Sequence, residues 1–194
     1  MTEIDQGALA RAQGEARTWF EQLWLRLEES VGHDGEPWRL PTVATVGLDG
    51  APRARMMVLR GACATARTLE LCSDTRAEKV AEWYACPKVA LCFWDPAQGV
   101  QLRARGHVHP LGEAEVEARR SSLSTTGLRL YQGTPAPGMP LGAPEGHSVG
   151  AEVHMSVLRC TLYTLDALAL SSPAHRRMRA VWKGEAWALD WVAP

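Results

Sequence analysis

The chain lacks a long hydrophobic run and a charged leader. Its 194 residues contain no apolar stretch near the ~20 residues that a membrane-spanning helix needs. The opening residues, Met1-Thr2-Glu3-Ile4-Asp5, also lack the basic and then apolar pattern of a secretory signal peptide. We therefore expect a cytoplasmic protein with no membrane partner. A chain of this length fits one domain with its own core, so we expect 1–194 to form a single domain.

The chain also lacks an excess of charge of either sign. Its 21 lysines and arginines are offset by 22 acidic residues, which leaves a formal charge of -1. Proteins that bind nucleic acid draw on an excess of positive charge, and none exists over this sequence as a whole. We expect no nucleic-acid partner, and any cluster of cations must be local.

Cysteine, phenylalanine and tyrosine are all scarce. The five cysteines include no Cys-x-x-Cys pair, which argues against a zinc site and against a disulfide framework. We expect them to be small buried residues. Eight tryptophans stand beside only two phenylalanines and three tyrosines. Tryptophan is enriched in cores and interfaces, so this balance favours a dimer.

Hydrophobic periodicity predicts one opening helix followed by short strands. Apolar residues recur at helical spacing from Asp5 to Ser30, which predicts an amphipathic helix within an N-terminal extension over 1–35. Asp49-Gly50 predicts a tight hairpin between Thr42–Val46 and Met56–Leu59, because Asp-Gly tolerates positive φ angles. Further strands are expected at Leu69–Cys72, Val89–Trp94, Val100–Val108, Ser156–Tyr163, Leu165–Leu170, Arg177–Trp182 and Ala186–Trp191.

Two shorter helices and one long loop interrupt these strands. Thr75 and Glu78 have the spacing of a capping box, which predicts a helix through about Tyr84. A second, acidic helix is expected over Gly112–Ser124, closed by Gly127. The Pro/Gly-rich stretch 132–150 is either a lid over a site or a mobile surface loop. Short strands without regular βα alternation predict a mainly β fold, a closed or nearly closed antiparallel barrel with peripheral helices.

The turn from Ser73 to Lys79 has the composition of a phosphate site. A helix start offers backbone N–H groups, and nearby cations add charge-assisted hydrogen bonds. Arg76 and Lys79 are three residues apart, so both can lie on one face of a first helical turn. The alternative is a surface helix whose cations are merely solvated.

Two strands carry further polar residues. Arg55 and Arg60 have opposite parity, so either their strand bulges or Arg60 lies past its end. Gln101, Arg103 and Arg105 share one parity, which predicts a polar face on their strand.

Histidines offer weaker candidates. His107 and His109 lie on one side of a strand, but no third ligand stands near them, so we expect no metal site. His175 is a candidate catalytic acid or base because imidazole titrates near neutrality, and a structural role fits it equally well.

Together these segments resemble the pyridoxamine 5'-phosphate oxidase family of FMN-binding split β-barrels. The resemblance rests on Arg55-Met56-Met57-Val58-Leu59-Arg60, the turn that ends in Lys79, Pro87, and Gln101 fourteen positions later. His175-Arg176-Arg177 and the final Trp187-Ala188-Leu189-Asp190-Trp191-Val192-Ala193-Pro194 resemble the family's closing motifs. It spans roughly Thr42 to Pro194 and omits the first helix.

The resemblance implies an antiparallel split β-barrel that binds FMN between the two subunits of a homodimer. Arg55 and Lys79 would hold the FMN phosphate, and Arg60 would replace a lysine near the flavin ring. Gln101 and Arg177 would reach the flavin from the partner subunit. The remaining expected cofactor contacts are backbone groups of Met56, Met57, Val58 and Leu59, and the turn residues Ser73, Asp74 and Arg76.

The departures from the family pattern concern the substrate more than the cofactor. Ala77-Glu78 replace a serine and an arginine, a loss for which Arg76 would compensate. The family's substrate-phosphate groups are missing, because the corresponding positions hold Arg119, Leu123, Gly127 and Pro173. Each lost charge-assisted hydrogen bond is worth about 1.5–3 kcal/mol. Leu168 stands near the position of a flavin-contacting tryptophan. We therefore expect the cofactor and not the pyridoxine phosphate substrate.

The leading hypothesis is an FMN-dependent oxidoreductase that acts on an unidentified small molecule, with the flavin performing the electron transfer. One alternative is a non-catalytic protein that stores or senses FMN. Others are a split barrel that binds a deazaflavin or haem, and a dimeric interaction module that has lost its cofactor.

Overall fold

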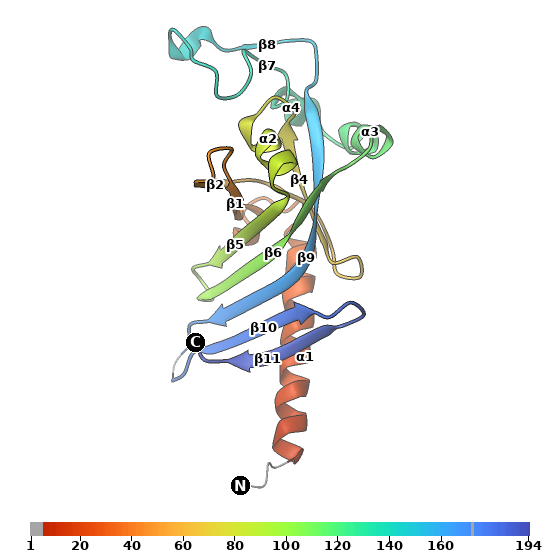
Figure 1. The fold of residues 1–194 in the computed structure, drawn as a ribbon, viewed down its shortest axis with the longest axis vertical. Coiled ribbons are helices and arrows are strands. Elements are labelled where there is room, and N and C mark those ends of the chain that lie inside the picture. Colours follow the sequence, from red (N-terminus) through yellow and green to blue (C-terminus); the bar gives the residue numbers. More distant parts are fainter. Residues whose placement is uncertain (1–5, 172) are drawn as a thin grey trace.

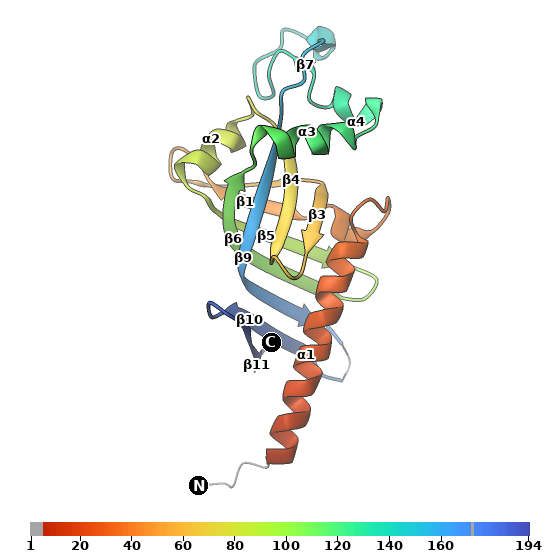
Figure 2. The same cartoon turned by 90° about the vertical axis from the view of Figure 1, so that its right-hand side faces the viewer.

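The computed structural model describes residues 6–171 and 173–194. The chain opens with α1 (Gln6–Glu29), which lies along one side of the sheet near β3 and β11 (Figure 2). Its buried residues are the members of the expected helical stripe: Ala16, Phe20, Leu23, Trp24 and Leu27. The amphipathic helix is therefore confirmed, although the expected start at Asp5 lies outside the described residues. Phe20 packs on Trp187 with ring centroids 5.5 Å apart.

The main sheet is antiparallel throughout its pairings (Figure 1). Its order is β11-β10-β9-β6-β5-β1-β2, and β4 pairs with both β3 and β9. The strands are β1 (Thr42–Val46), β2 (Pro52–Met56), β3 (Leu59–Cys63), β4 (Thr68–Asp74), β5 (Lys88–Asp95), β6 (Val100–Pro110), β9 (Met155–Ala169), β10 (Arg176–Trp182) and β11 (Trp187–Val192). The predicted mainly β, antiparallel fold is confirmed.

Of the two expected forms of the barrel, closed and nearly closed, the described residues exclude the closed one, because β2 and β11 remain at the two ends of the strand order. The 15-residue β9 pairs with three other strands. One of its edges pairs with β6, while the other pairs first with β4 and then with β10. The sheet therefore branches along β9.

Ser156–Tyr163 and Leu165–Leu170, expected as two strands, form the single strand β9, which contains a bulge. Arg105 pairs with Thr164 and Gly106 pairs with Leu162, so Tyr163 is the extra residue. A Cβ at Gly106 would lie 2.5 Å from the carbonyl oxygen of Thr161, which explains why glycine occupies the partner strand there. The bulge bends β9 without ending it.

The core lies between α1 and the inner face of the sheet. Leu102, Ala104 and Val108 of β6 are buried, while Arg103 and Arg105 are exposed, which confirms the two faces predicted for this strand. All five cysteines are free, but only Cys160 is buried, so the expectation of buried cysteines holds for one of them. No helix of the described residues is long and apolar enough to cross a membrane.

The turn at Asp49-Gly50 is confirmed, and Gly50 adopts a φ of 79°, but the second strand of the hairpin is β2 and not the expected Met56–Leu59. The capping box of Thr75 is wrong, because α2 (Glu78–Ala85) begins after Ala77. The preceding turn is instead closed by Asp74, whose Oδ1 accepts the N–H of Arg76 at 2.9 Å. A short 3-10 helix, η1 (Pro37–Arg39), leads into β1.

The expected acidic helix is divided into α3 (Glu113–Ser121) and α4 (Thr125–Arg129). Gly127 does not close α3, because it lies inside α4, where its N–H donates to Ser124 Oγ at 3.1 Å. The Pro/Gly-rich stretch contains a small hairpin of β7 (Gly133–Thr134) and β8 (Ser148–Val149), with η2 (Pro144–Gly146) before β8.

Candidate cofactor site

A cleft of about 580 Å³ opens where β2, β3, β4 and the start of α2 meet. Most of the expected cofactor-binding residues line it: Arg55, Met56, Met57, Val58, Arg60, Ser73, Asp74 and Lys79. Leu130, Tyr131, Pro137 and Gly138 close it from α4 and the 132–150 stretch, and Cys72 contributes from β4. The sequence reasoning missed Tyr131, since only its position in space connects it with the motif residues.

A break and a bulge bring Arg55 and Arg60 to the same cleft. β2 ends at Met56, and the N–H of Met57 donates to the carbonyl of Pro41 at 3.1 Å. Leu59 then pairs with Leu71 and Gly61 with Glu70, which leaves Arg60 as the extra residue of a bulge. The bulge resolves the parity conflict between the two arginines. Leu59, also expected to contact the cofactor, is buried in the core and does not line the cleft.

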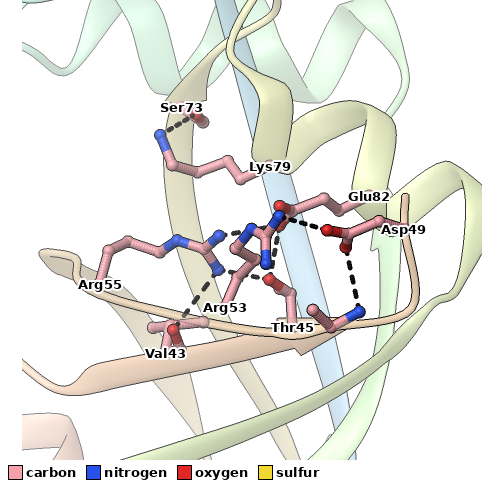
Figure 3. Close-up of polar contacts among 9 residues, drawn as sticks. Val43, Thr45, Asp49, Arg53, Arg55, Ser73, Lys79 and Glu82 are labelled. Carbon is pink, nitrogen blue, oxygen red and sulfur yellow. Dashed lines mark hydrogen bonds and ion pairs between the residues drawn. The ribbon is translucent and has the colours of Figure 1, made fainter. Parts of the chain in front are cut away.

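A buried carboxylate positions Arg55 (Figure 3). Its guanidinium donates to Glu82 Oε2 at 2.8 Å and to Thr45 Oγ1 at 2.5 Å. Thr45 also donates to Glu82 Oε2, at 2.5 Å. The Glu82 side chain is only 1% exposed, so the ion pair is largely shielded from water. Glu82 and Thr45 were not predicted from the sequence, since neither belongs to a recognisable motif.

Lys79 is a cation of the cleft that has no carboxylate within ion-pair distance in the described part of the chain. Its Nζ lies 3.5 Å from Ser73 Oγ, which is the limit of a hydrogen bond (Figure 3). Burial, and then the neighbouring Arg55 guanidinium, lower the pKa of Lys79. This ammonium would gain most from an added anion, since an opposite charge favours the protonated form.

Arg60 and Tyr131 supply further donors to the same cleft. Arg60 Nε is buried without a hydrogen-bond partner in the described residues. Burial, together with Cys72, raises the pKa of Tyr131 to about 12. The Tyr131 hydroxyl therefore stays protonated at neutral pH, and it interacts with the Arg60 side chain.

Arg76 does not line the cleft. Its Nε and Nη2 donate to the Asp74 carboxylate at 3.0 and 2.7 Å, and Nη2 also donates to the carbonyl of Gly133 at 2.7 Å. It precedes α2, so it does not share a helical turn with Lys79 as expected. Burial would raise the pKa of Asp74, but the hydrogen bonds from Arg76 keep it below its usual value. The expected compensation for Ala77-Glu78 is absent from this geometry.

Gln101 and Arg177 lie away from the cleft of their own chain. Each pairs with Leu168 of β9, one from β6 and the other from β10, so the three positions form a row across the sheet. Arg177 donates to the Asp166 carboxylate at 3.0 and 2.9 Å. It also lines a separate hollow of about 460 Å³ on the outer sheet face, together with Arg103, Arg105, Asp166 and Arg179.

The histidine candidates also lie outside the cleft lining. His175 is exposed, immediately before β10. His107 packs on Tyr163 with ring centroids 5.1 Å apart.

A family model described as "Pyridoxamine 5'-phosphate oxidase, FMN-binding domain" matches residues 16–112, half of the chain. The pyridoxine/pyridoxamine 5'-phosphate oxidase of Thermosynechococcus vestitus is 36% identical over 99 residues, covering 51% of this chain and 46% of the relative. The enzyme of the same name from Anaeromyxobacter dehalogenans is 37% identical over 99 residues, covering 51% and 48%. The matched part spans about half the length of these curated relatives.

Solved structures resemble the chain over nearly its whole length. A pyridoxamine 5'-phosphate oxidase-related, FMN binding protein from Nostoc punctiforme has a TM-score of 0.70 at 20% identity, covering 100% of this chain and 98% of that one. PhzG from Burkholderia lata, in complex with tetrahydrophenazine-1-carboxylic acid, has a TM-score of 0.70 at 17% identity, covering 94% and 92%. At these identities the likeness shows the fold alone, which is the split barrel expected from the sequence.

Proposed function

This chain belongs to the pyridoxamine 5'-phosphate oxidase FMN-binding domain family, and we propose that it is an FMN-dependent oxidoreductase with its cofactor in the cleft of β2, β3, β4 and α2. The observation that carries the proposal is the half-buried ammonium of Lys79, which faces Ser73 and Arg55 without a carboxylate partner in the described residues. A phosphate dianion would satisfy this donor set with charge-assisted hydrogen bonds.

Each residue of the cleft has a distinct part in this proposal. Glu82 and Thr45 hold the Arg55 guanidinium in place before the ligand arrives, so little reorganisation is needed on binding. Lys79 and Ser73 contact the phosphate, while Arg60 and the protonated Tyr131 donate to the flavin side of the cleft. When bound, FMN supplies a ring that accepts and returns electrons. We leave Arg76 out of the phosphate site because Asp74 and Gly133 occupy its donors.

The same proposal includes a homodimer with FMN at the subunit interface. Gln101 and Arg177 share a row through Leu168 and lie outside their own cleft, so they could contact a flavin only on a partner subunit. The hollow beside them has alanines as well as arginines, and small side chains permit close approach of a second sheet. Light scattering should give the mass of two chains. We expect Arg177→Ala to weaken FMN binding without removing any group from the cleft.

Storage or sensing of FMN without catalysis is the second candidate function. Arg119, which stands where the family has a substrate-binding tyrosine, donates to Glu70 and does not line the cleft. Leu123 packs in a small cluster with Tyr131, Met155 and Val157. The substrate-phosphate groups are therefore not replaced from these positions. If no small organic electron donor reduces the holoprotein, this second function is favoured.

The decisive experiment identifies the bound molecule and then removes Lys79. Mass spectrometry of the small molecule released from purified protein should give FMN, and a deazaflavin or haem would overturn the cofactor proposal. Lys79→Ala should weaken FMN affinity at least about tenfold, because a lost charged hydrogen bond costs about 1.5–3 kcal/mol. Lys88→Ala is the matched control, since Lys88 is exposed at the start of β5. Equal affinity in both variants would remove the phosphate assignment.

A further inference from the structure

Residues 133–149, here called the flap, form one boundary of the cleft. Pro137 and Gly138 are among the residues that line it. The flap hairpin lies at the α2 and α4 end of the molecule, at the N-terminal end of β9 (Figure 1). Met139, Leu141 and Val149 are exposed on it, at 59%, 43% and 53%. The flap therefore meets the cleft along one side and has little packing elsewhere.

Backbone hydrogen bonds hold the two ends of the flap together. The N–H of Gly150 donates to the carbonyl of Gln132 at 2.7 Å, and the N–H of His154 donates to that of Tyr131 at 2.8 Å. Gly133 and Thr134 of β7 pair with Val149 and Ser148 of β8. These bonds do not fix the position of the flap relative to the cleft.

The Arg76 side chain joins the flap to the wall of the cleft. Its Nη2 donates to the carbonyl of Gly133 at 2.7 Å while Asp74 holds the rest of the guanidinium. Within residues 6–171 and 173–194, this is the hydrogen bond that joins the flap to the rest of the chain, and no ion pair joins them. Asp74 belongs to the cleft wall, so the bridge runs from the wall to the first residue of the flap.

We propose that Arg76 is a positioning residue that fastens the flap over the cleft, and that it sets how fast a ligand enters and leaves. Opening and closing of such a segment gates access to a site. The hydrogen bond from Arg76 to the Gly133 carbonyl is here called the tether. If the ligand passes only when the flap is open, a weaker tether raises the association and dissociation rates together. The affinity, which is their ratio, then changes little. The identity of the ligand as FMN rests on the proposed function, while the tether itself does not.

The tether is tested first without any ligand, by limited proteolysis of Arg76→Ala. Chymotrypsin can cut the flap after Leu141, whereas trypsin has no site in it, because no lysine or arginine lies between Arg129 and Arg159. We expect cleavage after Leu141, identified by mass spectrometry, to rise about tenfold, the effect of losing one charged hydrogen bond. Apart from the site after Arg76, which the substitution removes, the tryptic pattern should stay that of the unaltered protein and so report an intact fold. The rate of cleavage in Arg76→Lys, which keeps one cationic donor group, should lie between the rates of the unaltered protein and Arg76→Ala. An unchanged rate after Leu141 would overturn the proposal.

Binding kinetics then separate a tether from a phosphate ligand. In Arg76→Ala, stopped-flow fluorescence with FMN should show both rate constants raised several-fold and a Kd within about threefold of the unaltered protein. Lys79→Ala should show the opposite, a higher Kd with unchanged cleavage of the flap. A Kd that rises as far in Arg76→Ala as in Lys79→Ala would make Arg76 a phosphate contact and overturn its role as a gate. If the unaltered protein binds no FMN, the proposed function fails and the proteolysis still decides the tether.

Discussion

Two clusters of charged residues, each with a contribution from β4, differ in how far their charges are balanced. The α3 cluster consists of Glu70, Arg119, Arg159 and Glu115, in which Arg159 reaches Glu70 at 2.8 Å and Glu115 at 3.1 Å. Arg119 also pairs with Glu70. The cleft cluster consists of Arg55, Glu82, Lys79 and Ser73. There Arg55 and Glu82 neutralise each other, and Lys79 is left with a hydroxyl.

The difference separates a structural cluster from a binding site. In the α3 cluster two cations meet two carboxylates, so a ligand would have to displace an existing partner. In the cleft cluster one positive charge is left over, in a position where burial already disfavours it. Natural folds retain such uncompensated charges where they serve binding or catalysis. The α3 cluster should therefore contribute to stability, and Lys79 should contribute to binding.

The largest expected effect comes from breaking the shielded pair of the cleft. Arg55→Ala would leave the Glu82 carboxylate, 1% exposed, with Thr45 as its remaining donor. Removing one partner of a buried ion pair costs about 3–5 kcal/mol, so we expect a loss of that order in the free energy of unfolding, measured with urea.

The double variant Arg55→Ala/Glu82→Gln provides the control. It removes the stranded charge, so it should recover part of the stability that Arg55→Ala loses. If the single and double variants were equally stable, Glu82 would not be the partner that makes Arg55 necessary.

A smaller effect is expected in the α3 cluster. Glu70→Gln at pH 7 should cost about 1–2 kcal/mol, because its partners Arg119 and Arg159 are 28% and 38% exposed and water can replace the lost carboxylate. Glu115→Gln, which leaves Arg159 paired with Glu70, should cost less. A loss of 3 kcal/mol or more in Glu70→Gln would make the two clusters alike.

The pH dependence of this loss follows from the pKa of Glu70. Burial would raise that pKa, but hydrogen bonds from Arg159 and Arg119 keep it below the usual value of 4.5. The carboxylate therefore stabilises the fold above the unfolded-state pKa, and this contribution disappears as the pH falls through the folded-state pKa. Urea unfolding from pH 7 down to pH 3 should show the unaltered protein and Glu70→Gln converging. A constant difference would exclude the ionic contribution.

Much of the fold could be predicted because local patterns and tertiary packing agree. The buried stripe of α1 and the alternation of β6 both follow from side-chain periodicity. The branching of β9 could not be predicted, since its bulge at Tyr163 arises from pairing with β6 and leaves no turn signal in the sequence.

The candidate site was predictable in its motif residues and not in their partners. Arg55 and Lys79 stand in recognisable positions, and the structure brings both to one cleft. Which cations are already neutralised depends on distances in space. The sequence could not show that Asp74 pairs with Arg76 while Lys79 has only the Ser73 hydroxyl as a partner among the described residues. Tyr131 likewise reaches the cleft only through the fold of α4 and β7.

The smallest expected effect is also the one of opposite sign. Because burial and Arg55 lower the pKa of Lys79, the unfolded chain binds this proton more readily than the folded one. Stability is therefore reduced at pH values below the folded-state pKa, and the penalty fades as the pH rises through it. Lys79→Met keeps the aliphatic length and removes the charge. Without ligand at pH 7, it should be more stable than the unaltered protein by up to about 1 kcal/mol, a limit set by partial exposure of the ammonium.

Urea unfolding of the ligand-free protein, repeated with saturating FMN, measures the stability lost through Lys79 and the stability gained from FMN binding. FMN should stabilise the unaltered protein by an amount that grows with its concentration, and the gain should be much smaller in Lys79→Met. Lys88→Met is the matched control, since it removes an exposed lysine at the start of β5 and should change neither quantity. A ligand-free Lys79→Met protein that was less stable than the unaltered one would place Lys79 with the α3 cluster, as a charge kept for the fold and not for binding.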